Sequence, residues 1–241
     1  MTNSSRVTKI GLLVFGVLLL GSASWAQSCP PAAEKVAKAF GLDSFGQIEA
    51  IRYTFNLPVF KISRTWTWEP KADRVTYEGK DKAGNPVKVT YVRSQLGSQP
   101  DNVKKEIDPG FTNDQYWLVF PFHACWDTSA KVEDQGMQKL PLGKGSARRV
   151  VVKYPSDVGY TPGDTWELYV GPDNRVAVLH FHHGGSAKPG EVIATWAGYK
   201  KAGPLLISTD HHGTADGKPF GLTFTDVAVK LAGSDTWVDA K

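Results

Sequence analysis

A period-two alternation of apolar and polar residues runs from about residue 47 almost to the C-terminus, and this pattern is typical of half-buried antiparallel strands. Turn-rich segments at 82–86, 171–174 and 215–219 join neighbouring candidates and suit hairpins better than helical crossovers. The predicted strands cover residues 47–57, 59–69, 73–79, 86–94, 147–154, 164–170, 175–183, 191–199, 204–211 and 220–230.

About ten antiparallel strands cannot remain a flat open sheet, because strand twist curls such a sheet or splits it in two. A helix is predicted at 31–40, opened by Pro30-Pro31 and closed by Gly41. Residues 100–128 interrupt the alternation and carry a dense aromatic run at 116–122. The predicted fold is therefore mainly β (α+β). It is an incomplete antiparallel barrel or curved sheet, with the N-terminal helix and a middle helical excursion covering its concave face.

The first 26 residues have the order of a cleavable export signal: Arg6 and Lys9, the apolar run 10–20, then small residues ending at Ala26. The run is too short for a spanning helix, which needs roughly 20 apolar residues. We therefore predict a signal peptide at 1–26 and one domain at 27–241, located in the periplasm or secreted. The predicted mature chain has a formal charge of +2, which is too small to indicate nucleic-acid binding.

Two cysteines, Cys29 and Cys125, follow the predicted cleavage point. An even count in an oxidising compartment permits one disulfide between them. A second interpretation makes Cys29 the lipidated first residue of an anchored protein, which would exclude the disulfide. The approach to Cys29 lacks the large aliphatic residue expected three places before such a cysteine.

No catalytic signature emerges from the sequence. A Gly-x-Ser-x-Gly elbow is absent, the short glycine pairs do not lie between a strand and a helix, and the scattered acids select no carboxylate pair. The predicted function is therefore non-enzymatic, with no cofactor.

Histidines offer an alternative function, because His180 and His182 point to the same side of one predicted strand. The hairpin register places this pair on the outer face with Glu167, opposite the apolar side chains of the two strands. The pair could bind zinc or copper if His211 or His212 supplied a further ligand. The competing interpretation is a polar outer face with solvated histidines.

Aromatic residues are abundant, and five of them are candidates for lining an apolar groove. They are Trp66, Trp68, Trp117, Phe120 and Phe122. Large aromatic side chains are also ordinary in a β-rich core, so the sequence leaves both interpretations open.

Four segments, at 111–122, 159–170, 195–199 and 224–229, follow one another in an order that resembles a family of uncharacterised exported bacterial proteins. That family is related to the outer-membrane lipoprotein-sorting (LolA/LolB-like) proteins. The resemblance covers most of residues 47–230 and rests on aromatic and turn spacing. It implies an incomplete barrel closed by helices, with an apolar cavity that receives acyl chains.

These observations together predict an exported protein that binds a lipid or a lipoprotein acyl chain in an apolar groove. Further envelope proteins are expected as partners, and nucleic acid is not. The alternative is a periplasmic metal-binding protein that uses the histidine group.

Overall fold

The computed structural model describes residues 29–81, 83–157, 160–185 and 190–241. The predicted signal peptide at 1–26 lies outside the described residues. The α-helices are α1 (Pro31–Ala39) and α2 (Asp108–Trp126). Shorter helical turns are η1 (Leu42–Gln47), η2 (Pro58–Phe60), η3 (Pro70–Ala72), η4 (Arg93–Ser98) and η5 (Val103–Ile107).

The strands occupy both halves of the chain on either side of α2. They are β1 (Ile48–Leu57), β2 (Ile62–Glu69), β3 (Arg74–Lys80), β4 (Pro86–Val92), β5 (Lys131–Lys139), β6 (Ser146–Lys153), β7 (Thr165–Val170), β8 (Val176–His182), β9 (Glu191–Thr195), β10 (Lys200–Ala202), β11 (Leu205–Ile207), β12 (Asp210–Ala215), β13 (Lys218–Leu231) and β14 (Trp237–Asp239).

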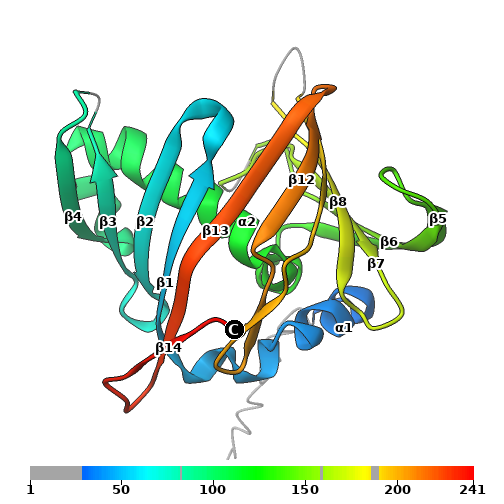
Figure 1. The fold of residues 1–241 in the computed structure, drawn as a ribbon, viewed down its shortest axis with the longest axis horizontal. Coiled ribbons are helices and arrows are strands. Elements are labelled where there is room, and N and C mark those ends of the chain that lie inside the picture. The colour runs from blue at the N-terminus through cyan, green and yellow to red at the C-terminus, as the bar shows by residue number, and fades with distance from the viewer. Residues whose placement is uncertain (1–28, 82, 158–159, 186–189) are drawn as a thin grey trace, which may run out of the picture.

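Twelve of these strands form one antiparallel sheet in the order β4-β3-β2-β1-β13-β12-β9-β8-β7-β6-β5, with β14 added beside β13. The long strand β13 pairs with β1 and β12 and so joins the N-terminal and C-terminal halves of the sheet. The sheet is strongly curved and does not close into a barrel (Figure 1). This confirms the predicted mainly β fold with a curved antiparallel sheet.

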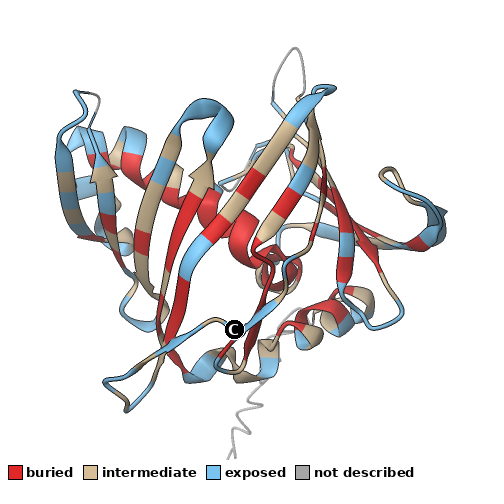
Figure 2. Ribbon diagram, viewed as in Figure 1, coloured by how far each residue is buried: buried red, intermediate tan, exposed pale blue. Residues whose placement is uncertain are grey.

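Helix α2 lies across the concave face of the sheet, and most of its residues are buried (Figure 2). Apolar side chains occur all around it, as expected for a helix enclosed in a core. The helix kinks at Val119, two residues before Pro121, whose ring cannot continue regular helical hydrogen bonding. The predicted middle helical excursion is therefore confirmed, and it fills the middle of the concavity.

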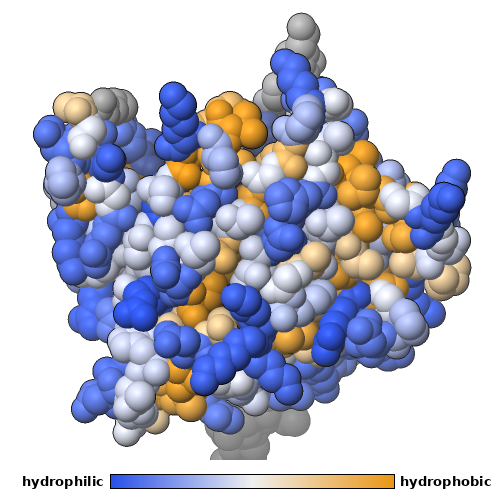
Figure 3. Space-filling model, viewed as in Figure 1, coloured by the Kyte–Doolittle hydropathy of each residue, from blue (hydrophilic) through white to orange (hydrophobic). Residues whose placement is uncertain are grey.

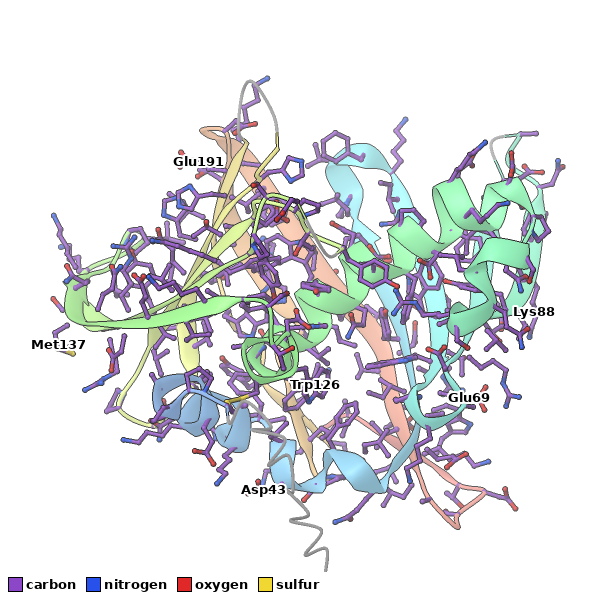
Figure 4. The ribbon with its side chains drawn as sticks, turned by 180° about the vertical axis from the view of Figure 1, so that it is seen from behind. Asp43, Glu69, Lys88, Trp126, Met137 and Glu191 are labelled. Carbon is purple, nitrogen blue, oxygen red and sulfur yellow. A yellow bond between two sulfur atoms is a disulfide. The ribbon has the colours of Figure 1, made fainter. Side chains whose placement is uncertain are left out.

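Helix α1 packs beside the end of α2 and buries Ala33, Val36 and Ala37. It is followed by Gly41, whose φ of 100° suits glycine best. A disulfide joins Cys29, just before α1, to Cys125 in the last turn of α2. Figure 4 shows this bond near the labelled Trp126. The N-terminal segment is thereby tied to the helix that fills the concavity.

The face of the sheet turned away from α2, here called the outer face, is mainly hydrophilic (Figure 3). Hydrophobic atoms are exposed at the tip of the β1–β2 hairpin, where Val59 and Phe60 are 65% and 68% accessible. Among the described residues, none of the helices is both long enough and apolar enough to cross a membrane.

Candidate functional site

An apolar cavity of about 540 Å³ lies between strands β2, β3 and β4 and the η5 turn that precedes α2. We call it the β2–β4 cavity. Its apolar lining consists of the half-buried Val87 and of Trp66, Tyr77 and Ile107, which are at most 8% accessible. Its more polar border consists of Arg64, Lys80, Asp81, Asn102 and Glu106, with Ala83 beside them. Trp66 and Tyr77 face this cavity from adjacent strands because the β2–β3 register pairs them directly.

Polar groups in the cavity wall already bind one another. Asp114 of α2 accepts hydrogen bonds from Arg64 Nε at 2.8 Å and from Trp66 Nε1 at 2.8 Å. The Tyr77 hydroxyl donates to the carbonyl oxygen of Lys80 at 3.2 Å. Burial raises the pKa of Asp114, while the guanidinium of Arg64 opposes that rise. The two aromatic side chains at this cavity therefore have their polar atoms paired without a ligand.

The five aromatic residues predicted to line a groove share the concave side of the sheet, where the structure places them in different surroundings. Trp66 borders the β2–β4 cavity, and the half-buried Trp68 packs against Phe45 and Phe111. Trp117, Phe120 and Phe122 lie on α2 and are at most 6% accessible. They fill the predicted groove instead of lining it, because α2 itself enters the concavity and packs its aromatic run against the sheet.

A second cavity, of about 570 Å³, lies between α1 and the strands β5, β6 and β7. Val36 of α1 faces Val150 and Val170 of the sheet across it. Met137, labelled in Figure 4, stands at its outer border. The concave face thus has an open apolar space on either side of α2.

Polar residues gather on the outer face of β7 and β8, where Glu167 pairs in register with His180. Glu167 is only 5% accessible, since Arg149, Tyr169 and the two histidines cover it. Burial raises the pKa of Glu167, but hydrogen bonds from His180 and Arg149 outweigh burial and lower it to about 2. The structure thus places His180 and His182 beside an ionised carboxylate.

His211 does not join this outer pair, contrary to the sequence-based expectation. It is fully buried on the opposite face of the sheet, and its ring centroid lies 4.3 Å from that of Trp196. Its Nδ1 donates to the carbonyl oxygen of Thr195 at 3.1 Å. His211 and His212 are consecutive in β12, so their side chains leave opposite faces. His212 instead pairs with Asp210.

The buried His211 predicts a pH dependence of stability. Burial lowers its pKa to about 3, against about 6.5 in an unfolded chain. Between these values the unfolded chain binds a proton that the folded chain does not, so stability falls as pH decreases below about 6.5. The expected loss from His211 is about 2 kcal/mol between pH 7 and pH 5.

His211→Asn provides the comparison, because asparagine retains a donor near Thr195 but does not titrate in this range. Urea unfolding of both proteins at pH 7 and pH 5 measures the difference. If the free energy of unfolding falls equally in the wild type and the variant between pH 7 and pH 5, this role for His211 is contradicted.

The fold and cavities define a class of structure: a curved antiparallel sheet with a buried helix in its concavity and an apolar cavity on either side. Searches against family models and against curated proteins find no match. A crystal structure of a DUF1329 family protein from Desulfovibrio piger is similar over 85% of this chain and 94% of that chain, with 8% identity and a TM-score of 0.45. These comparisons do not show the relation to lipoprotein-sorting proteins that the sequence suggested.

Proposed function

We propose that this protein binds an apolar ligand of the acyl-chain type in the β2–β4 cavity, without catalysis. The observation that carries the proposal is the internal pairing of the polar groups in the cavity wall. Trp66 Nε1 is bound to Asp114, and the Tyr77 hydroxyl is bound to Lys80. A purely apolar ligand could therefore bind beside these side chains without leaving their donors unpaired, which would be costly.

The size of the cavity supports the same class of ligand. Its volume of about 540 Å³ falls within the range of roughly 300–1,000 Å³ typical of small-molecule sites. Burial of apolar ligand surface would supply binding energy at about 25 cal/mol per Å². The cavity is also open to solvent along Lys80 and Asp81, so a polar head group could remain hydrated there.

Location in the cell envelope is part of this proposal. The export signal predicted at 1–26 would place the protein where lipids and lipoproteins supply acyl chains. The Cys29–Cys125 disulfide is compatible with that setting, because disulfides persist in oxidising compartments. It also occupies the sulfur atom that lipidation of Cys29 would require.

A cavity-filling substitution tests the proposal. Val87→Trp adds an indole on the cavity side of β4, and we expect it to weaken binding of palmitic acid at least tenfold by occupying ligand space. Lys88→Trp is the matched control, because the neighbouring Lys88 is exposed on the other face of the same strand and pairs with Glu78. Displacement of a fluorescent fatty acid by palmitic acid measures both.

Two results would overturn the proposal. One is the absence of saturable fatty-acid binding by the wild-type protein. The other is equal binding by Val87→Trp and the wild type when circular dichroism shows that both are folded.

A further inference from the structure

Three potential metal-donor groups converge on the outer face of the sheet, away from the proposed lipid cavity. A carboxylate oxygen of Glu167, a ring nitrogen of His180 and one of His182 all lie within 4.8 Å of one another. His182 Nε2 is 3.1 Å from Glu167 Oε1, and His180 Nδ1 is 3.6 Å from Glu167 Oε2. Donor atoms around a tetrahedral zinc ion stand about 3.3 Å apart, given metal–ligand distances of about 2.0–2.1 Å. Small side-chain rotations would therefore bring these three into coordinating positions.

Pairing of β7 with β8 holds the donors at this spacing. Glu167 lies directly opposite His180, and Thr165 lies opposite His182. His180 and His182 leave the same side of β8, with ring centroids 3.9 Å apart. Since the ligands project from paired strands, folding of the sheet itself preorganises them.

Neighbouring side chains orient two of the donors. His180 Nε2 lies 2.9 Å from Glu191 Oε2, which directs Nδ1 of the same ring toward Glu167. Carboxylates commonly fix metal-binding histidines in this way. Arg149 binds both oxygens of Glu167, and the Tyr169 hydroxyl donates to one of them at 3.1 Å. Glu167 thus has a fixed position, while its contacts with the histidines remain available for exchange.

From this arrangement we propose that Glu167, His180 and His182 bind a divalent transition-metal ion of the zinc class. Two imidazoles and one carboxylate are a ligand set that zinc accepts in three-ligand sites, with the fourth position left to water or another ligand. His182 is the most accessible of the three, with 35% of its side chain exposed, so the ion can enter from solvent on its side.

The type and number of donor atoms determine which metal ions the site prefers. Calcium and magnesium need several oxygen ligands, whereas this group offers one carboxylate whose charge is already shared with Arg149. Imidazole nitrogen is favoured by zinc, copper and nickel instead. The site should therefore discriminate strongly against both alkaline-earth ions.

Isothermal titration of the mature protein with Zn²⁺ tests the proposal. We expect saturable binding of one ion, at least tenfold weaker binding by His182→Ala, and no detectable binding of Mg²⁺ or Ca²⁺. His183→Ala is the matched control, because His183 is 59% exposed and pairs with Asp164 instead of Glu167. It should bind Zn²⁺ as the wild type does.

Glu167→Gln provides an independent test of the carboxylate, and circular dichroism must show that it folds. Loss of Zn²⁺ binding by both Glu167→Gln and His182→Ala would support the site. Absence of saturable Zn²⁺ binding by the wild type, or equal weakening by His183→Ala and His182→Ala, would overturn it. Neither result depends on fatty-acid binding, so this proposal and the proposed function can fail separately.

Discussion

Replacing Asp114 with alanine should lower the free energy of unfolding by about 3–5 kcal/mol, the cost of breaking a buried ion pair from one side. Asp114 is fully buried on α2 and binds Arg64 and Trp66 of β2. Its removal would leave the Arg64 side chain, which is only 24% exposed, without its partner, and an indole N–H unpaired in the core. The helix that fills the concavity would lose its main polar connection to β2.

Chemical denaturation of the wild type, Asp114→Ala and Asp101→Ala measures this effect. Asp101 is the control, because its ion pair with Lys105 is exposed and screened by solvent, so its removal should change stability little. If Asp114→Ala lowers the free energy of unfolding no more than Asp101→Ala does, the Arg64–Asp114–Trp66 network does not hold α2 against β2.

Removal of the disulfide is expected to have the second large effect. Cys29 and Cys125 are 96 residues apart, so their bond restricts the unfolded chain strongly. The double variant Cys29→Ala/Cys125→Ala should lose about 2–5 kcal/mol of stability. The same change would release the segment before α1 from the end of α2. Residues of α1 line the second cavity, which lies nearby.

Thermal unfolding of the double variant and of the wild type, each with and without a reducing agent, measures this contribution. Reduction should lower the melting temperature of the wild type toward that of the variant and leave the variant unchanged. A melting temperature that is the same in all four samples would contradict the stabilising role of the bond.

The sequence predicted well those features that depend on the period of a strand. Trp166, Leu168 and Val170 are buried as their alternation indicated, and Glu167 emerges on the opposite face beside His180. A period of two leaves each side chain one of two faces, so one apolar row determines the other row. The grouping of His180 and His182 with Glu167 on one face could be predicted from the sequence for this reason.

The apolar–polar alternation could not predict local features of the backbone such as turns and polar edge strands. The predicted strand 59–69 began too early, because the turn Pro58–Phe60 and a left-handed Lys61 precede β2 and leave Phe60 exposed. Strand β5 was not predicted, because this edge strand is rich in charged and polar residues and lacks apolar alternation. Both errors arise where backbone geometry, and not side-chain periodicity, decides exposure.

Whether the aromatic run lines a groove or packs in the core depends on tertiary packing. An aromatic run such as 116–122 has the same composition whether it lines a cavity or fills one. Only the path of α2 through the concavity shows that Trp117, Phe120 and Phe122 belong to the core. The cavity that remains depends on how far η5 stands from β2 and β3, which no sequence pattern encodes.

Quenching of tryptophan emission by a bromine-substituted palmitic acid tests the central claim most directly. Trp66 is the tryptophan among the described lining residues of the β2–β4 cavity, and it borders the cavity from the protein interior with 0% of its surface accessible, so a bromine atom on a chain bound there would lie near its ring. We expect saturable quenching of the wild type that is largely lost in Trp66→Phe, while displacement of a fluorescent fatty acid shows that this variant still binds. Quenching that is the same in both proteins, or absent from the wild type, would contradict acyl-chain binding in this cavity.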